Sequence, residues 1–312
     1  MSFRKSRCTL LALFLLVASG GAARAQNIET YATGVPGPWG LAFDPSGTLY
    51  VTNHGTTLYK VPAGGGSASA FVTSSLFVHP VGIVCDPSGN VWVADRGDLA
   101  VANTGKILKV TPAGVVSLFK GSLPSLFGLT MDVSGNLYAG VYNGQKVIKL
   151  TPAAVVSDYG TGLGVVGNQT YQLDFDDAGN LYAGNEDRIL RIAPGGSPVT
   201  QVIGGLSQAM GFVRWTGDNF IVATFGFGRL KYASPTRGNP AVDITSIALA
   251  DHCADGPMVA GTRVDQPVFM TLRDGWVYLA DQNCSKVRRF FLPGMPVGAG
   301  QRTWGAVKAI YR

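Results

Sequence analysis

The sequence has little of what helical and nucleic-acid-binding proteins need. Glutamate occurs only twice, at Glu29 and Glu186, and charged residues make up 14% of the chain. Glycine occurs 42 times and proline 17 times. A chain this poor in a helix-favouring residue and this rich in turn formers is expected to contain little helix. No dense cluster of lysine and arginine occurs, so the sequence gives no support to a nucleic-acid partner.

Long apolar runs are missing outside the N-terminus. There, three basic residues precede an apolar run at residues 10–17, and small residues end at Ala25. This layout is that of a secretory signal, and the run is short for a membrane span. We therefore predict a signal peptide at residues 1–25 and a secreted or periplasmic mature chain, residues 26–312, without a membrane span.

A strong charge of either sign is also missing from the predicted mature chain. The whole chain has a net charge of +6, but four of its basic residues and none of its acidic residues lie before Gln26. The mature chain thus carries 21 basic and 19 acidic residues, a net charge of +2. This balance does not favour a polyanionic partner.

Cysteine is scarce, with four residues in the chain. Cys8 lies in the predicted signal, Cys85 lies in an apolar run, and Cys253 and Cys284 lie beside polar loop residues. Because exported proteins meet an oxidising environment, we predict a Cys253–Cys284 disulfide and a buried free thiol at Cys85.

An internal repeat is the main feature that is present. The segment GLAFDPSGTLYVTN at residues 40–53 returns in three close copies and two weaker ones. The copies begin at residues 82, 128, 173, 211 and 269. The spacing of about 40–50 residues is the period of a β-propeller blade.

Each repeat predicts four short strands. An Asp-Pro-Ser-Gly-type turn separates the first two strands, and a Pro-Ala-Gly-type turn precedes the fourth. Residues 28–32 precede the first repeat and predict an additional fourth strand that closes the ring. The predicted fold is all-β: a single six-bladed β-propeller of four-stranded antiparallel blades, with an insertion between blades five and six at about residues 236–265.

The repeat pattern Pro-x-Gly-[Ile/Leu]-Ala-x-Asp-x-x-Gly-x-[Leu/Val]-Tyr-Val-x-[Asp/Asn] resembles NHL-repeat propellers. It also resembles the gluconolactonase and regucalcin superfamily, with its strictosidine synthase and streptogramin lyase relatives. The resemblance extends from Tyr31 to about Pro293 and implies a six-bladed propeller. These families include lyases, hydrolases and binding modules, so the resemblance alone does not give the function. It implies a site on the top face, where the loops between second and third strands (B–C loops) meet the loops between blades (D–A loops).

The loops of the predicted top face differ between blades, whereas the turns of the opposite face repeat. Variable loops on a rigid scaffold are typical of binding sites. We therefore predict a monomeric module that binds a small molecule, a glycan, a peptide or a protein through its top face. The candidate ligand-binding residues are Trp39, Asn53, His54, Arg96, Tyr142, Phe225 and Phe227.

The alternative prediction is a hydrolase or lyase assisted by a divalent metal. Asp95, Asn185 and Asp281 occupy equivalent strand ends and offer oxygen ligands suited to Ca²⁺ or another divalent cation. The same side chains would otherwise cap the strand ends, and no cofactor would then be needed. The candidate catalytic residues are His79, His252 and Glu186, of which His79 resembles a histidine position of the lyase branch.

One departure from the lactonase pattern bears on the alternative. The lactonase branch has an asparagine before the first strand of a blade, where this chain has Trp39, Val81, Phe127 and Met210. A third interpretation, a quinone-dependent sugar dehydrogenase, is supported only by residues 38–43. The predicted insertion would be either a lid that turns His252 and Asp255 toward the site, or a surface loop that the disulfide holds in place.

Overall fold

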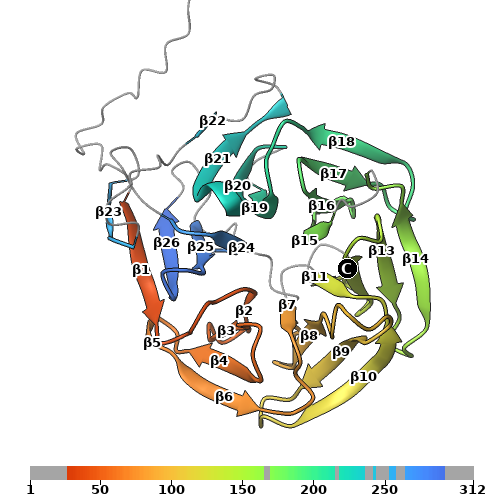
Figure 1. The fold of residues 1–312 in the computed structure, drawn as a ribbon, viewed down its shortest axis with the longest axis horizontal. Helices are drawn as coiled ribbons and strands as arrows, with labels where there is room; N and C mark the ends of the chain where they lie inside the picture. The colour runs from red at the N-terminus through yellow and green to blue at the C-terminus, as the bar shows by residue number, and fades with distance from the viewer. Residues whose placement is uncertain are drawn as a thin grey trace, which may run out of the picture.

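Six β-sheets are arranged in a ring around a central axis in the computed structural model (Figure 1). The structure describes residues 27–164, 169–214, 218–235, 242–243, 253–257 and 264–291. This arrangement confirms the predicted six-bladed β-propeller. The predicted signal peptide, His252 and most of the predicted insertion lie outside the described residues.

The first three blades have four strands each, the first of each set lying nearest the axis (Figure 1). Blade one contains β2 (Leu41–Phe43), β3 (Leu49–Val51), β4 (Thr57–Val61) and β6 (Ser69–Thr73). Blade two contains β7 (Pro80–Cys85), β8 (Val91–Asp95), β9 (Gly105–Val110) and β10 (Val116–Leu123). Blade three contains β11 (Leu126–Met131), β12 (Leu137–Val141), β13 (Lys146–Leu150) and β14 (Val156–Thr161).

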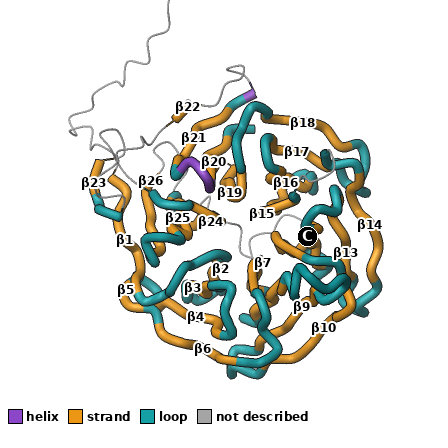
Figure 2. The backbone as a smooth tube through the Cα atoms, viewed as in Figure 1, coloured by secondary structure: helices purple, strands orange, loops and turns teal. Residues whose placement is uncertain are grey.

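The remaining blades follow the same order, and a short 3-10 turn, η1 (Phe225–Phe227), interrupts the strands of blade five (Figure 2). Blade four contains β15 (Thr170–Phe175), β16 (Leu181–Asn185), β17 (Arg188–Ile192) and β18 (Val199–Ile203). Blade five contains β19 (Ala209–Arg214), β20 (Phe220–Thr224), β21 (Arg229–Ala233) and β22 (Val242–Asp243). Blade six contains β24 (Pro267–Arg273), β25 (Trp276–Asp281) and β26 (Lys286–Phe291). No helix within the described ranges is long and apolar enough to cross a membrane.

The N-terminal strand closes the ring, as the sequence predicts. Strand β1 (Asn27–Thr33) pairs antiparallel with β26, so that Ile28 lies opposite Phe290. Two short strands cover the other edge of β1: β23 (Gly256–Pro257) runs antiparallel to it and β5 (Gly66–Ser67) runs parallel. The first and last parts of the chain thus share one blade, and its outer edge is not left open.

The repeated aspartate turn has a physical role in the first four blades, where its carboxylate accepts a backbone N–H four residues on. In blade two the Asp86 carboxylate accepts the backbone N–H of Asn90 at 2.9 Å and the indole N–H of Trp92 at 3.0 Å. In blade three Asp132 accepts the hydroxyl of Tyr138 at 2.9 Å. The turn therefore fixes its own backbone, which accounts for its recurrence, and in blades two and three it also holds an aromatic side chain of the next strand.

Glycine recurs on the innermost strands because neighbouring blades approach closely there. A Cβ atom at any of four glycines would overlap a backbone carbonyl oxygen of the following blade. Only a residue without a side chain allows this approach. The glycine and carbonyl pairs are Gly40 with Val81, Gly82 with Phe127, Gly128 with Tyr171, and Gly211 with Val268.

Blade four has Gln172 at this glycine position, and its side chain bridges three blades. The amide Nε2 donates to the carbonyl oxygens of Phe212 and Met270, both at 2.7 Å. The Oε1 atom accepts the N–H of Met270 at 2.9 Å and that of Phe212 at 3.3 Å. Since Met270 belongs to blade six and Gln172 to blade four, the bond between them crosses the ring (Figure 1).

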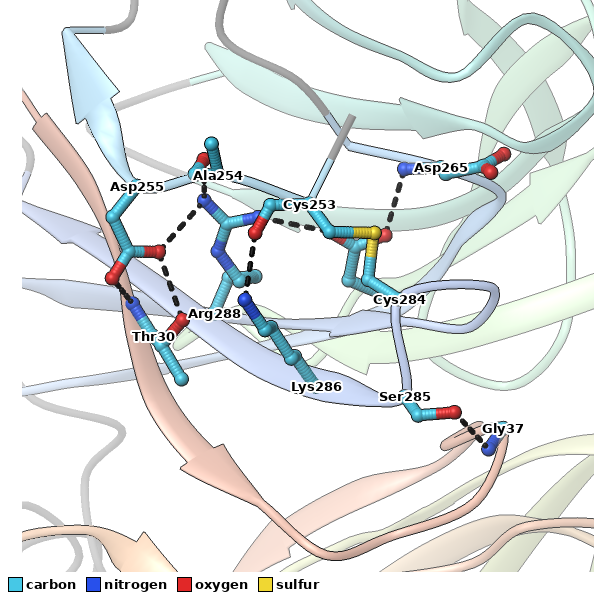
Figure 3. The surroundings of a disulfide bond; sticks show 11 residues. Thr30, Gly37, Cys253, Ala254, Asp255, Asp265, Cys284, Ser285, Lys286 and Arg288 are labelled. Carbon is cyan, nitrogen blue, oxygen red and sulfur yellow. Dashed lines mark hydrogen bonds and ion pairs between the residues drawn. A yellow bond between two sulfur atoms is a disulfide. The ribbon is translucent and has the colours of Figure 1, made fainter. Parts of the chain in front are cut away.

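The predicted disulfide between Cys253 and Cys284 is present, and Cys85 is a free cysteine. Figure 3 shows how polar bonds fasten the same segment: Lys286 Nζ donates to the Cys253 carbonyl at 2.7 Å, and Arg288 donates to the Ala254 carbonyl at 2.7 Å. Residues 253–257 of the predicted insertion are therefore held against blade six, whereas its residues 242–243 form the fourth strand of blade five.

Asp255 does not face the top-face site, although the lid hypothesis expects it to. Its carboxylate accepts the backbone N–H of Thr30 at 2.9 Å and the Thr30 hydroxyl at 2.8 Å, and it lies 3.1 Å from Arg288 Nη2 (Figure 3). Thr30 belongs to β1, at the outer edge of blade six (Figure 1). The expectation that Asp255 faces the top-face site is thus wrong, because the ring-closing strand and a buried cation hold this carboxylate.

Candidate functional site

The B–C and D–A loops lie together on one end of the ring. The N–H at the start of a B–C loop donates to a carbonyl of a D–A loop, and this bond recurs around the ring. The bonds are His54 to Pro80 at 3.3 Å, Arg96 to His79 at 2.9 Å, Tyr142 to Ser125 at 2.8 Å and Phe225 to Gln208 at 3.1 Å. The structure thereby brings the predicted ligand-binding loops of blades one, two, three and five to a common face, the top face.

Aromatic rings from four blades meet on the top face. Trp39 stacks on His54 with ring centroids 3.8 Å apart, and it contacts Phe225 at 6.2 Å. Phe127 lies 6.0 Å from Trp39 and stacks on Tyr142 at 5.1 Å. Tyr171 completes the group, with its ring 5.5 Å from Phe127. We call these six residues the mouth cluster: Trp39, His54, Phe127, Tyr142, Tyr171 and Phe225.

The mouth cluster has a buried layer and a partly exposed layer. Trp39, Phe127 and Tyr171 keep only 7%, 3% and 4% of their surface exposed, whereas His54, Tyr142 and Phe225 are partly exposed. The first three rings therefore form an apolar floor, and the others present surface to a ligand. Sequence reasoning did not select Phe127 and Tyr171 as ligand contacts, although both lie directly before the inner strand position that is usually glycine.

Two histidines lie beside each other at the edge of the mouth cluster. The rings of His54 and His79 are 6.0 Å apart, and His79 Nδ1 lies 3.1 Å from the Gly97 carbonyl oxygen. Because a carbonyl only accepts, this bond requires the proton of His79 on Nδ1 and leaves Nε2 as an acceptor. Burial, with the charge of Arg96, lowers the pKa of His54 to about 3. His54 is therefore neutral at physiological pH.

Arg96 adds a positive charge to the same surface. Its guanidinium carbon lies 5.8 Å from the centroid of the Phe127 ring. Burial lowers its pKa from the ordinary value, although arginine stays charged at neutral pH. Among the residues that the structure describes, its Nε atom is buried without a hydrogen-bond partner, as are Trp39 Nε1 and His54 Nε2.

Glu186 lies on the blade-four side of the cluster. Its carboxylate accepts the hydroxyl of Tyr171 at 2.7 Å. Burial and this hydrogen bond both raise the pKa of Tyr171 well above its ordinary value. Glu186 therefore supplies a carboxylate, and Tyr171 a neutral phenol, to the edge of the apolar floor.

Asp95 has the environment of a loop cap. Its carboxylate accepts the backbone N–H groups of Val78 at 2.7 Å, His79 at 3.1 Å and Gly97 at 2.9 Å. The side chain has no exposed surface. It therefore fixes the two loops that carry His79 and Arg96, and both of its oxygens are already used.

Asp281 is bonded within blade six in a similar way. Its Oδ1 accepts the N–H of Asp265 at 2.7 Å, and its Oδ2 lies 3.3 Å from Nη1 of the buried Arg288. Burial raises the pKa of Asp281 against the opposing effects of these two partners. Nothing in this arrangement leaves a carboxylate oxygen directed at a shared ion.

The predicted metal ligands Asp95, Asn185 and Asp281 belong to three different blades. Asn185 is fully buried at the end of β16, in a different blade from Asp95 and Asp281. Across the described part of the chain, no group of three or more His, Cys, Asp or Glu side chains could hold a metal ion. Backbone N–H groups and Arg288 already engage the carboxylates of Asp95 and Asp281, so their bonding gives no support to a shared divalent cation, and no catalytic step is derived through one.

The remaining candidates differ in their surroundings. Asn53 caps its own loop, since its Oδ1 accepts the N–H of Gly55 at 3.1 Å. Phe227 is 50% exposed on η1. His252, a candidate catalytic residue, lies outside the described residues.

Comparison with solved structures identifies propellers of several functions. An auxiliary nutrient binding protein from Bacteroides thetaiotaomicron is 12% identical, with a TM-score of 0.69 over 85% of this chain and 76% of that chain. A streptogramin B lyase is 16% identical, with a TM-score of 0.63 over 85% and 97% of the two chains. The PQQ-bound aldose sugar dehydrogenase from Streptomyces coelicolor is 15% identical, with a TM-score of 0.60 over 85% and 98%.

These likenesses agree with the six-bladed β-propeller of the structure and show the fold alone. Comparison of the sequence with protein-family models and with curated proteins finds no match. Binding proteins, a lyase and a dehydrogenase share the fold at similarly low identity. The function must therefore be inferred from the site itself.

Proposed function

We propose that this protein is an exported propeller that binds a ligand at the mouth cluster. The observation that carries the proposal is a group of three buried polar atoms for which the described residues provide no hydrogen-bond partner: Trp39 Nε1, His54 Nε2 and Arg96 Nε. Buried polar atoms in folded proteins are nearly always paired. Here three such atoms lie around one set of rings, and a ligand with polar groups would satisfy them once the partly exposed side chains above them shift.

The mixture of rings and polar groups supports the same proposal. Binding sites for small molecules are mostly apolar and aromatic, with a few polar groups that orient the ligand. The floor made by Trp39, Phe127 and Tyr171 is apolar, and Arg96 and Glu186 lie at its edges. Tyr142 and Phe225 provide the partly exposed surface that a ligand can cover.

A binding screen of the purified protein against glycan and peptide arrays tests the proposal. Tyr142→Ala and Phe225→Ala should each weaken binding of a positive ligand by about tenfold or more, since both remove a contact ring. Phe119→Ala is the matched control, because Phe119 is a partly buried ring packed on Trp92 in the outer part of blade two. Equal affinity in all four proteins would contradict the assignment of the mouth cluster.

Export is supported by the N-terminal residues alone. Mass spectrometry of the mature protein recovered from outside the cytoplasm should give an N-terminus at Gln26, following cleavage after Ala25. A protein that keeps residues 1–25, or that stays in the cytoplasm, would contradict this part of the proposal.

A hydrolase or lyase at the same surface is favoured by one observation. The bond from His79 Nδ1 to Gly97 fixes the tautomer and leaves Nε2 as a proton acceptor near His54. A histidine held in this way can act as a general base. Screening lactones and streptogramin-type substrates with the native protein and His79→Gln would show turnover that the variant loses; turnover equal in both would remove His79 as the base.

A further inference from the structure

Arg96 differs from five other arginines of the described chain in its charge environment. Each of those five has a carboxylate oxygen within 4.0 Å of its guanidinium: Arg188, Arg191, Arg273, Arg288 and Arg289. For Arg96 the described residues show no such ion pair. The neighbouring Asp95 carboxylate accepts three backbone N–H groups instead.

The contacts that Arg96 does make satisfy only part of its bonding capacity. The Phe127 ring lies 5.8 Å from its guanidinium carbon and attracts the cation through its π face. A ring provides no hydrogen-bond acceptor of carboxylate strength, and Arg96 Nε is buried with no partner in the described part of the chain. A partly buried guanidinium in this state is suited to a planar anion, which accepts two parallel N–H bonds.

We propose that the ligand of the mouth cluster presents a carboxylate to Arg96. This inference rests on the proposed function and adds the chemistry of the ligand. The carboxylate would accept two N–H bonds of the guanidinium while the rest of the ligand covers Tyr142 and Phe225.

The polar groups around the mouth cluster favour a hydroxylated ligand over an acidic peptide. Trp39 Nε1 can only donate, the Glu186 carboxylate can only accept, and the neutral His54 ring has one donor and one acceptor nitrogen. Hydroxyl groups both donate and accept, so several on one ring can meet all three demands. An Asp or Glu side chain would bring a carboxylate but no hydroxyl groups. A uronic acid, alone or in an oligosaccharide, combines the carboxylate, the hydroxyls and an apolar ring face.

The test compares an acidic sugar with its neutral ester. Isothermal titration would measure binding of trigalacturonic acid, its methyl ester and an acidic peptide to the native protein. We expect the acid to bind at least about tenfold more tightly than the ester and the peptide, since a charged hydrogen-bonded pair is lost in the ester. The affinity for the acid should fall as the NaCl concentration is raised, because salt screens the attraction between the carboxylate and Arg96.

Three arginine variants test whether the effect belongs to Arg96. Arg96→Gln should lose the preference for the acid over the ester, and Arg96→Lys should keep the charge but weaken binding by losing the two-bond geometry. Arg273→Gln is the matched control, since Arg273 also lies over a ring, Phe43, at 5.1 Å, but has Asp274 as a partner. Circular dichroism of each variant would confirm folding.

The outcomes separate this inference from the proposed function. Equal binding of acid and ester, unchanged in Arg96→Gln but lost in Tyr142→Ala, would overturn the carboxylate inference and leave the binding site in place. Tighter binding of the acidic peptide through Arg96 would overturn the carbohydrate part. Absence of any ligand sensitive to Tyr142 or Phe225 in the array screen would overturn the proposed function and this inference with it.

Discussion

Gln172 offers a direct test of how the ring is held together at its centre. Replacing it with alanine removes two donated and two accepted hydrogen bonds to Phe212 and Met270. The side chain is only partly buried, so water can replace some of these bonds, and the net value of about 0.5–1.5 kcal/mol per bond applies. With one bond long at 3.3 Å, we expect Gln172→Ala to lower the free energy of unfolding by about 2–4 kcal/mol.

Urea denaturation followed by tryptophan fluorescence would measure this change as a shift in midpoint at constant slope. Gln201→Ala is the matched control, because Gln201 lies exposed on β18. A decrease in unfolding free energy of less than about 0.5 kcal/mol for Gln172→Ala would refute the reasoning, since surface substitutions that remove no specific contact usually have an effect of this size.

A second variant at this position gives a pH signature. Gln172→Glu places a carboxylate beside two carbonyl oxygens to which the native amide donates. Repulsion should raise the pKa of the introduced carboxyl in the folded state above its unfolded value of about 4.3. A folded state that binds more protons gains stability as pH falls. The difference in unfolding free energy between this variant and the native protein should therefore shrink below about pH 5; a constant difference would contradict the assigned bonds.

Three further predictions concern the Cys253–Cys284 disulfide and the candidate site. Replacing Cys253 and Cys284 by alanine opens a loop with a sequence separation of 31 and should cost about 3–4 kcal/mol of unfolding free energy on the chain-entropy model, measured against the oxidised protein in denaturant. Burial lowers the pKa of His54 to about 3 in the folded state, whereas the pKa in the unfolded state is about 6.5. The unfolded state therefore binds a proton first, and the free energy of unfolding should decrease as pH falls from about 6.5 toward 3. His54→Gln should remove this pH dependence in denaturation curves. Asp95→Asn should lower stability by about 1–3 kcal/mol through weaker bonds to the loop amides, with no change in metal content by mass spectrometry; loss of a bound divalent cation would contradict the capping role.

The fold could be predicted from the sequence because each blade repeats the same local signals. The Asp86 turn, for example, uses one carboxylate to hold its own backbone and the indole of Trp92, so the same residues must return wherever the turn returns. Ring closure was also predictable, since residues 28–32 form a strand with no partner in their own repeat. The structure extends that strand to Asn27–Thr33 and pairs it with β26.

The candidate site was predictable only in part, because a repeat gives the position of a loop and not the direction of its side chains. Arg96, His54 and Tyr142 were selected from the top loops, and the structure places all three around Phe127 or Trp39. Asp95 was selected by the same argument, yet its carboxylate turns into its own loops. A carboxylate at a strand end can cap a loop or bind an ion, and only the surrounding N–H groups decide between these roles.

Two blades depart from the repeat at the inner-strand glycine position, and both replacement side chains support the centre of the ring. Four inner strands have glycine where neighbouring blades touch, whereas Gln172 and Phe269 occupy the same position in blades four and six. Gln172 ties blades four, five and six together, and Phe269 packs within 6.5 Å of Trp39, beneath the mouth cluster. Both larger side chains fill space near the axis that glycine would leave. The mouth cluster therefore rests on a supported floor, and a ligand that reaches Arg96 would bind on this surface without entering the ring.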